Sequence, residues 1–543
     1  MIYVPRHCDL LIIGGGITGA GIFFETTRLG LNVVLVERHD FAWGTSSRSS
    51  KLIHGGLRYL KEGQLRLTRD AVKERERLLH EVPGLVTPIT FLVPIYKDHG
   101  PGRWTLEAGL SIYDLLAKKR QHRYLNPEEM IQLIPFIERK GLTGGYQFQD
   151  AQVDDARLVL RLIDQGRQCG GTALNYTTAE TIHRDDHGTV IGAALQDVES
   201  KEAVRIDTLA IINATGCWAE TLHPQNHHKQ LRPLKGSHLI FTHDALPVQT
   251  AVSFMHPKDS RPLFAIPWEG VTLVGTTDLD YGNDLEMEPA ISEEEADYML
   301  EGVRALFPSM GLSLDQCISS LAGIRPVISS GNAKNPSEES REHDIWVDNG
   351  MVTVAGGKLT TYRRVALDAI KAAIPFLPPI DEAQLAPLQP SATDVLPPEG
   401  FTDTRAWQRL YGRYGQGAGT IIAQAAKRDL QPIDTTPILW AELPYAAAHE
   451  SVRHLTDLLL RRVRLGLLLP DGGKTHMKRI KKLCRTKLGW SRQRWHQEEK
   501  AYFNHWEKAH GFAWRIKPKD RWQRLLESVS GLFEKIFTKS RVQ

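Results

Sequence analysis

Two neighbouring stretches decide the fold: Leu10-Leu-Ile-Ile-Gly-Gly-Gly-Ile-Thr-Gly-Ala-Gly21 and Val33-Val-Leu-Val-Glu37. A short apolar strand leads into a G-x-G-x-x-G turn formed by Gly14, Gly16 and Gly19. In such a turn the first glycine permits the tight bend, the second lets the backbone approach a pyrophosphate, and the third lets the following helix pack close to the strand. The helix N-terminus offers N–H groups to the phosphates, and the acid that ends the second strand is placed to accept a ribose hydroxyl. The unit therefore predicts a dinucleotide-binding fold and a redox protein.

The composition is that of a folded globular protein long enough for several domains. The chain has 543 residues, of which 41% are hydrophobic and 24% charged. Its net charge is only +3, but Asp471–Gln543 holds 19 Lys and Arg against 7 Asp and Glu, so the rest of the chain is acidic. A basic end on an acidic body predicts an anionic partner, and a solvated helical face is the alternative. No recognisable nucleic-acid motif is present, so we expect no nucleic acid among the partners.

The cysteines and apolar runs restrict the compartment. The five cysteines form no C-x-x-C pair and show no zinc or iron–sulfur spacing, and they are Cys8, Cys169, Cys217, Cys317 and Cys484. They predict reduced, mostly buried thiols in a cytoplasmic protein without a metal site. The first apolar run leads directly into the glycine turn, unlike a signal peptide, and no stretch approaches the roughly 18 apolar residues that span a bilayer. Any membrane contact is therefore expected to be peripheral.

Strand and helix signals divide the chain into an N-terminal α/β part and a helical C-terminal part. Residues 64–81 have helical spacing, and apolar or alternating runs predict strands at Phe91–Tyr96, Leu209–Asn213, Ser237–Thr242 and Thr272–Thr276. We therefore expect residues 1–375 to form a doubly wound domain with an inserted β-rich substrate domain, to which about 75–155 and 225–325 contribute. A Pro-rich linker follows at 376–400 and a helical domain at 401–510, in which Ser451–Leu468 keeps helical spacing.

The segment 511–543 is predicted to be a basic amphipathic tail. Its apolar residues fall on one helical stripe, with Arg521, Arg524, Lys535 and Lys539 around it. Such a helix can lie in the headgroup layer of an anionic membrane. The alternative is an ordinary helix docked on the body or on a second subunit, as in a homodimer.

Three cations in glycine-rich or proline-fixed settings are candidates for holding an anionic substrate. Arg58 follows Gly55-Gly56, Lys358 follows Gly356-Gly357, and Arg325 precedes Pro326. Paired glycines let the chain pass close to a ligand, and an arginine fork with a lysine charge can bind a phosphate or a carboxylate. The alternative is that each cation pairs with a surface acid.

Histidines and hydroxyls complete the candidate chemistry. His54 lies beside Gly55-Gly56, and His238 lies in Lys235-Gly-Ser-His238. An imidazole can accept an alcohol proton while a hydride leaves the same carbon, although a structural histidine is the more common case. The hydroxyl run at 45–50 can donate to a second phosphate or to a flavin ring, and a polar turn is its alternative.

Seven motifs in order resemble the FAD-dependent glycerol-3-phosphate dehydrogenase family. The motifs are Thr45-Ser-Ser-Arg-Ser-Ser-Lys-Leu-Ile-His-Gly-Gly-Leu-Arg-Tyr-Leu60, Val153-Asp-Asp-Ala-Arg-Leu158, Asn213-Ala-Thr-Gly216, Lys235-Gly-Ser-His238, Gly275-Thr-Thr-Asp278, Gly323-Ile-Arg-Pro326 and Gly356-Gly-Lys-Leu-Thr-Thr-Tyr362. The resemblance implies FAD rather than NAD, a glutathione-reductase-like FAD domain, and an antiparallel β substrate domain above the isoalloxazine. The chain lacks the cysteine-rich extension of the family's anaerobic form, so it is closer to the aerobic, respiratory type.

The resemblance also implies roles for individual residues. Those implied to bind FAD are Gly14, Gly16, Gly19, Glu37, Thr45, Ser46, Ser47, Lys51, Leu52, Gly357, Lys358, Leu359 and Thr360. Those implied to bind the substrate are Arg58, Tyr59, Arg325 and Lys358, and those implied near the reacting carbon are His54, His238 and Arg325. Which group takes the hydroxyl proton stays open.

The expected activity is FAD-dependent oxidation of sn-glycerol 3-phosphate to dihydroxyacetone phosphate, with electrons passed to a membrane quinone. The expected location is the cytoplasm, peripheral on the inner face of the cytoplasmic membrane. Three alternatives stay open: an oxidase that reduces oxygen, a flavin oxidase of amino or hydroxy acids, and a non-catalytic nucleotide- or nucleic-acid-binding protein.

Overall fold

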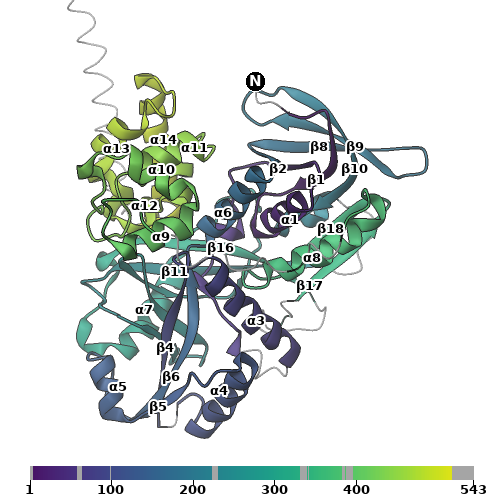
Figure 1. Ribbon diagram of the computed structural model, residues 1–543. Helices are drawn as coiled ribbons and strands as arrows, with labels where there is room; N and C mark the ends of the chain where they lie inside the picture. Colours follow the sequence, from purple (N-terminus) through teal and green to yellow (C-terminus); the bar gives the residue numbers. More distant parts are fainter. Residues whose placement is uncertain are drawn as a thin grey trace, which may run out of the picture.

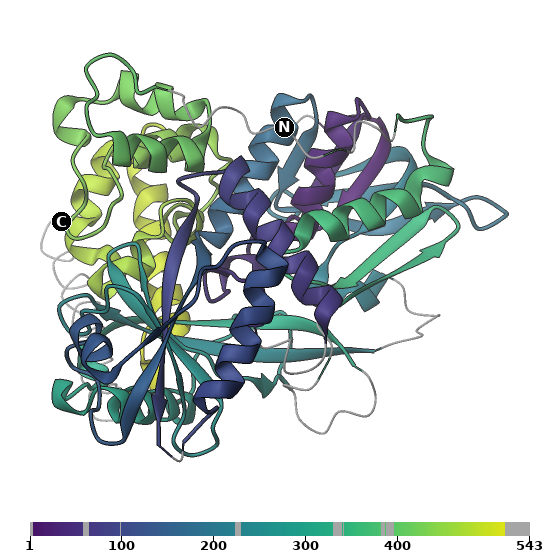
Figure 2. The same cartoon turned by 60° about the horizontal axis from the view of Figure 1, so that its bottom comes forward.

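Two sheets and a group of helices make up the molecule. The structure, a computed structural model, describes residues 4–57, 64–97, 99–222, 230–329, 339, 342–381, 386 and 396–515. The nucleotide-side sheet and the C-terminal helices lie next to each other, and the second sheet lies below both (Figures 1 and 2). The predicted α/β class with a helical C-terminal region is confirmed.

The first sheet is a parallel sheet that begins with the glycine-turn unit. Its parallel strands are ordered β7–β2–β1–β10–β18, with ranges Thr172–Asn175, Val33–Glu37, His7–Ile13, Ala203–Asn213 and Met351–Gly356. The edge strand β17 (His343–Asp348) pairs antiparallel with β18, and β8 (Thr177–Arg184) with β9 (Val190–Asp197) adds a hairpin onto β10. The strands predicted at 10–13, 33–37 and 209–213 are all present.

Both faces of this sheet are covered, which explains why its strands are continuous apolar runs rather than alternating ones. Leu10 and Ile12 of β1 pack with helices α1 (Ile17–Arg28), α6 (Asp155–Gln168) and α8 (Tyr362–Ala373), as the cluster around them shows. Leu11 and Ile13 point the other way and pack with the β8–β9 hairpin. The turn at the end of β1 is therefore held from both sides.

The second sheet is mixed. Its order is β15–β11–β14–β13–β12–β4–β6–β3, with β16 paired to β11 and β5 paired to β6. The ranges are Leu52–Ile53 (β3), Val86–Tyr96 (β4), Arg123–Leu125 (β5), Leu142–Val153 (β6), Leu231–Thr242 (β11), Ala251–Met255 (β12), Pro262–Trp268 (β13), Val271–Gly275 (β14), Leu279–Asp280 (β15) and Cys317–Ile328 (β16). All of its pairs are antiparallel except β4 with β12, so the expected antiparallel domain contains one parallel junction.

Helices cover the second sheet on both faces. Residues Phe91 and Val93 of β4 pack with helices α3 (Leu65–Glu81) and α4 (Arg103–Ala117), whereas Leu92 faces α5 (Pro127–Leu133) and α7 (Glu293–Leu306). This alternation follows from the period of two along a strand. The face that carries Phe91 and Val93 also turns toward the cavity described below.

The C-terminal region is helical, as predicted, but one expected helix is broken. Its elements are Thr404–Tyr414 (α9), Gly417–Gln424 (α10), Glu442–His449 (α11), Leu465–Leu468 (α12), Met477–Cys484 (α13) and Arg492–Ala509 (α14). The stretch 451–468, expected to be one helix, contains a π-helical turn at Asp457–Arg462 and a left-handed residue at Arg464, with φ of 60°. The interruption directs the Arg464 side chain to acidic residues of another domain.

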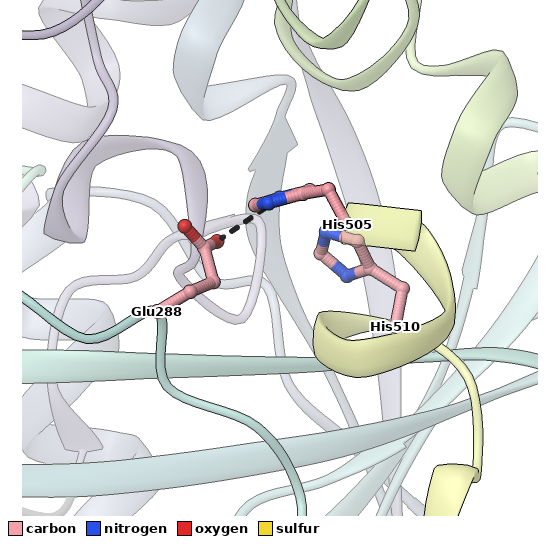
Figure 3. A group of neighbouring side chains, drawn as sticks. All are labelled: Glu288, His505 and His510. Carbon is pink, nitrogen blue, oxygen red and sulfur yellow. Dashed lines mark ion pairs between the residues drawn. The ribbon is translucent and has the colours of Figure 1, made fainter. Parts of the chain in front are cut away.

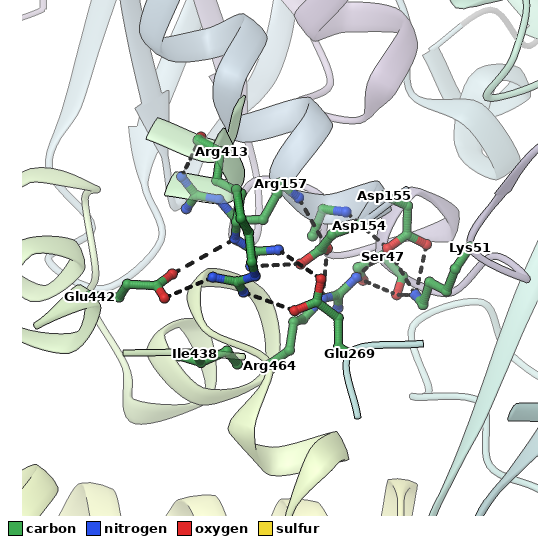
Figure 4. Close-up of polar contacts among 12 residues, drawn as sticks. Ser47, Lys51, Asp154, Asp155, Arg157, Glu269, Arg413, Ile438, Glu442 and Arg464 are labelled. Atoms are coloured by element: carbon green, nitrogen blue, oxygen red, sulfur yellow. Dashed lines mark hydrogen bonds and ion pairs between the residues drawn. The ribbon is translucent and has the colours of Figure 1, made fainter. Parts of the chain in front are cut away.

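Buried ion pairs join this helical region to the rest of the protein (Figure 4). Arg464 Nε donates to Asp154 at 3.0 Å and its Nη2 donates to Asp155 and to the Ser47 carbonyl. Arg413 Nη2 also donates to Asp154, at 2.9 Å. Although burial opposes ionisation, Arg464 and Arg413 hold the pKa of Asp154 below its usual value. Asp154 is therefore charged, and removing either arginine would leave its buried charge with fewer partners.

A second junction is centred on Asp40, just after β2. Its carboxylate accepts from Arg461 Nε at 2.5 Å and from Arg462 Nη1 and Nη2 at 2.6 and 2.7 Å. Asp40 and Arg462 are completely buried. The nucleotide-side sheet and the helical region are therefore held together by fully desolvated, hydrogen-bonded charges.

The helices and cysteines have the following features. Within the described ranges, no helix combines the length and apolar character needed to cross a bilayer. Of the five unlinked cysteines, Cys8, Cys217 and Cys484 are buried and Cys169 is exposed. Most of the basic amphipathic tail lies outside the described residues, which end at Arg515.

Candidate active site

One large cavity lies where the first sheet faces the second. Its volume is about 1300 Å³, and its walls include the turns that follow β1, β10 and β18. The apolar part of the wall is formed by side chains of β4 and β6, Phe91, Val93 and Phe148. Ligands of open α/β sheets bind outside the carboxyl ends of the parallel strands, which is where this cavity lies.

The glycine turn has no room for side chains. Gly14 has φ of +113°, and a Cβ there would lie 2.5 Å from the Ala214 carbonyl oxygen at the end of β10. A Cβ at Gly19 would lie 1.8 Å from the Gly14 carbonyl oxygen. Gly14 and Gly16 line the cavity, whereas Gly19 lies behind them and lets α1 pack against the turn. A tight bend at Gly14 and close helix packing at Gly19 are the two reasons for which the sequence analysis expected glycine at these positions.

Glu37 and Ser46 shape the nucleotide end of the cavity. The Glu37 carboxylate accepts from the N–H groups of Gly15 at 2.7 Å and His39 at 2.8 Å. Burial raises its pKa, and these two N–H groups oppose that rise. Ser46 Oγ accepts from the Ile17 N–H at 2.9 Å, in the first turn of α1. A helix N-terminus, a hydroxyl and a partly buried acid therefore meet on one wall.

These residues fit the adenosine-diphosphate part of FAD. A Cβ at Gly16 would come within 3.1 Å of Ser46 Oγ, so a larger residue would push against Ser46 and narrow the space between the turn and the loop. Thr45, Leu52, Gly357, Leu359 and Thr360, all expected at the flavin, also line the cavity. Phosphates are favoured beside α1 because its N–H groups and dipole point there.

Arg325 and Lys358 line the same cavity. Arg325 lies on β16, where its Nη1 donates to Asp278 at 2.8 Å and its Nη2 donates to Thr276 Oγ1 at 3.2 Å. The guanidinium passes directly over Gly236, where a Cβ would lie 2.2 Å from Nη2. Lys358 follows Gly356 and Gly357, whose φ angles are +71° and +88°. Both cations therefore face one cavity, and their meeting on a single anionic group stays a prediction.

Two expected substrate residues fall outside the described part of the chain. Arg58 and Tyr59 belong to the stretch between 57 and 64 that the structure does not describe. Their assignment to the substrate stays a prediction.

His54 lines the cavity and its loop is anchored from below. The Gly55 N–H donates to Asp150 Oδ1 at 3.1 Å, and Arg75 Nη1 donates to the same oxygen at 3.0 Å. Thr360 Oγ1 donates to the His54 carbonyl at 3.4 Å, which ties the two flavin-side loops together. The imidazole is thus carried on a backbone that buried polar groups hold in place.

His238 is behind the cavity wall rather than in it. The side chain is 2% exposed, and its Nε2 is 2.9 Å from Ser50 Oγ, while Ser50 itself lines the cavity. Burial and the charges of Arg325 and Lys51 lower the pKa of His238 to about 3, so the imidazole is neutral near pH 7. Any contact of His238 with a bound molecule has to pass through Ser50.

Lys51 and Ser47 also stand outside the cavity lining. The Lys51 ammonium is fully buried and donates to the Ser47 carbonyl at 2.7 Å and to Asp155 at 2.8 Å. Burial and the charge of Arg464 lower the pKa of Lys51 to about 8. Both residues therefore support the loop that carries Ser46 and Leu52, and their expected contact with FAD stays a prediction.

Several polar residues of the cavity were not named as candidates in the sequence analysis, among them Asp150, Arg261 and Asp278. Asp278 lies within one of the quoted motifs, so that motif marked its surroundings. Asp150 and Arg261 had no local signal, because their positions follow from the pairing of β6 and β13 in the second sheet.

Comparison with known proteins assigns the class. A family model described as FAD dependent oxidoreductase matches residues 9–363, and a model of the C-terminal domain of alpha-glycerophosphate oxidase matches residues 384–495. The chain therefore belongs to the family of FAD-dependent oxidoreductases, and FAD is the cofactor that the cavity is built to hold.

Individual relatives narrow this class. The chain is similar to an aerobic glycerol-3-phosphate dehydrogenase of Staphylococcus haemolyticus, with 35% identity over 84% of this chain and 86% of the relative. It is 40% identical to the enzyme of the same name from Bacillus subtilis over 66% of this chain and 65% of the relative. The chain is also similar to the glycerol-3-phosphate dehydrogenase from Bacillus halodurans, whose crystal structure was determined in complex with FAD. The two sequences are 28% identical, and their structures match with a TM-score of 0.73 over 93% of this chain and 95% of the other. Within the FAD-dependent oxidoreductases, the chain groups with the aerobic glycerol-3-phosphate dehydrogenases.

Proposed function

We propose that this protein oxidises sn-glycerol 3-phosphate to dihydroxyacetone phosphate and passes the electrons to a membrane quinone. The observation that carries the proposal is that Arg325 of β16 and Lys358 of the loop after β18 line one cavity together with His54 and the glycine turn. A dianionic phosphate matches a planar arginine fork beside a lysine charge. The names of the relatives support the same substrate.

The cationic end of the cavity binds the part of the substrate that does not react. Arg325 is held by Asp278 and Thr276, so its fork is oriented before the phosphate arrives. Binding energy from the phosphate then positions the C2 carbon, and this orientation contributes to the rate. Bound FAD supplies the hydride acceptor.

His54 is the residue we assign to accept the hydroxyl proton. It lines the cavity, and Asp150 and Thr360 fix its backbone. His238 reaches the cavity only through Ser50, so we assign His238 and Ser50 to positioning rather than to direct proton transfer. A base that takes the alcohol proton as the hydride leaves contributes about 100-fold or more to the rate.

An anaerobic titration tests the substrate. Addition of glycerol 3-phosphate to the purified yellow protein should bleach the flavin absorbance stoichiometrically, while glycine, proline and lactate should not. Bleaching by an amino or hydroxy acid and not by glycerol 3-phosphate would assign Arg325 to a carboxylate and refute the proposal.

Mixing the reduced protein with air or with a soluble quinone analogue tests the acceptor. We expect faster reoxidation by the quinone, and faster reoxidation by oxygen would identify an oxidase. This second candidate, an oxidase of glycerol 3-phosphate, is supported by the C-terminal family model, which is named for alpha-glycerophosphate oxidase.

The surface of α4 supports a peripheral membrane contact. Trp104, Ile112 and Leu115 of this helix are 77%, 41% and 76% exposed, and Ile112 also lines the cavity. The exposed basic run Lys118–Arg120 follows directly. Exposed apolar side chains beside cations fit an anionic lipid surface, and they bring a lipid-dissolved quinone close to the cavity.

The double change Trp104→Ser with Leu115→Ser tests this contact. It should release the protein from anionic liposomes and leave turnover with a soluble dye unchanged. Unaltered liposome binding would remove α4 from the proposed membrane contact. An inner-face location and a homodimer stay predictions.

A further inference from the structure

Two imidazoles and a carboxylate meet outside the cavity, at the junction of the last helix with the second sheet. Glu288 lies between β15 and α7, His505 lies on α14, and His510 follows the end of α14. One potential ligand atom from each residue lies within 4.8 Å of the others. Figure 3 shows the Glu288 carboxylate and the His505 ring facing each other beside the His510 ring. Among the described residues, these three form the one group of at least three His, Cys, Asp or Glu side chains whose potential ligand atoms lie this close together.

His510 is oriented as a ligand histidine is. Its Nδ1 is 3.0 Å from the Ser320 carbonyl, which can only accept, so Nδ1 carries the proton and Nε2 keeps its lone pair. The Ser320 N–H in turn donates to the His510 carbonyl at 2.7 Å. A backbone carbonyl that fixes the second ring nitrogen is the usual support of a metal-bound imidazole.

Glu288 is fixed by a cation and still has acceptor capacity. Arg48 Nη2 donates to Glu288 Oε1 at 2.5 Å. A carboxylate offers about four lone-pair sites, so one arginine contact leaves acceptor positions for a metal ion. His505 Nε2 is 3.9 Å from the same Oε1, and the His505 side chain is 30% exposed, which gives an ion access and gives the ring freedom to move.

We propose that Glu288, His505 and His510 form a binding site for a divalent first-row transition metal, with Zn²⁺ as the fitting ion. Two imidazoles and one carboxylate are borderline ligands of the kind that Zn²⁺ takes, and three protein ligands leave a fourth position for water. Donor atoms at a tetrahedral Zn²⁺ lie about 3.4 Å apart, so on metal binding the three side chains would draw together from their present separation of up to 4.8 Å.

The site joins parts of the chain that sequence spacing cannot connect. Glu288 is more than 200 residues from His505, so no ligand-spacing motif marks it, and the metal-free expectation from the cysteine spacing did not consider it. Both histidines also lie beyond residue 495, where the match to the C-terminal family model ends. A bound ion would link α14 to the segment around Glu288. Glu288 in turn pairs with Arg48, which lines the cavity. The site is independent of the substrate that the cavity takes.

Metal titration of the FAD-loaded protein tests the proposal. The protein is first treated with a chelator to remove metal ions, and its FAD content is checked. It is then titrated with Co²⁺, whose binding is followed by its ligand-field absorbance. Zn²⁺ is added last, in competition with the bound Co²⁺. We expect one equivalent to bind and Zn²⁺ to displace Co²⁺. Zn²⁺ should also raise the Tm of the full-length protein.

The variant His505→Gln carries the test, because this residue is partly exposed and its replacement spares the buried His510. Loss of a ligand should weaken Co²⁺ binding by at least about 100-fold. His496→Gln, on the exposed face of the same helix, is the matched control and should bind as the unaltered protein does. Absence of stoichiometric binding, or equal binding by the two variants, would overturn the proposal.

Discussion

Replacement of Gly236 by alanine is expected to damage substrate binding by moving one side chain. The new Cβ would lie 2.2 Å from Arg325 Nη2, and an ordinary contact begins near 3.4 Å. The guanidinium therefore has to withdraw by roughly 1 Å, and its bonds to Asp278 and Thr276 have to be rebuilt. A misplacement of about 1 Å at a positioning group can lower kcat/KM by about 100-fold, or about 2.7 kcal/mol of transition-state binding.

The assay is steady-state turnover of glycerol 3-phosphate with a soluble dye acceptor. We expect most of the loss in KM, because the phosphate fork is displaced, with FAD content and Tm close to those of the unaltered protein. The clashing atoms belong to the flexible end of Arg325, so folding is spared. Gly282→Ala is the matched control, since a Cβ there meets nothing within 4 Å. A kcat/KM within threefold of the unaltered value would refute the assigned role of Arg325.

Three further predictions concern stability and membrane binding. Asp40→Asn should lower the free energy of unfolding by about 3–5 kcal/mol in a denaturant titration, because two buried arginines lose their carboxylate. The control Asp348→Asn, at a half-exposed ion pair, should change it by less than about 1 kcal/mol. Equal effects of the two changes would contradict the buried junction. The imidazole of His238 gains a proton near pH 6.5 when unfolded but only near pH 3 when folded, so the folded state loses up to about 1.4 kcal/mol per pH unit as the pH falls from 6.5 toward 3. His238→Gln should therefore show a shallower loss of stability with acid, and parallel curves would remove this residue as a cause. Deletion of 516–543 should reduce binding to anionic liposomes and leave dye-linked turnover intact, and unchanged binding would exclude the tail.

The parts of the fold that were predictable are those fixed by local sequence. The strand at 10–13 is apolar on both faces because it is covered on both faces, and the glycines after it are required by contacts of 1.8 to 2.5 Å. These constraints lie within a few residues of one another, so a short stretch of sequence records them.

The parts that were not predictable depend on residues far apart in the chain. Lys51 lies in the expected loop, but its left-handed backbone, with φ of 61°, turns the ammonium toward Asp155 and away from the cavity. Similarly, the helical spacing of 451–468 gives no sign of the left-handed Arg464, whose conformation is explained by acids some 310 residues earlier. The following proline drew attention to Arg325, but its partner Asp278 emerges only from the pairing of the second sheet.

The bond from Arg464 to the Ser47 carbonyl has a consequence for the order in which the protein matures. The loop that carries Ser46 and Leu52 receives this anchor only after about the first 464 residues have been synthesised and the helices around them have formed. Domains emerging from the ribosome otherwise fold from the N-terminus onward. The residues of the glycine turn are thus available early, whereas the loop on the other side of the cofactor cleft gains its last anchor only when the C-terminal helices have folded.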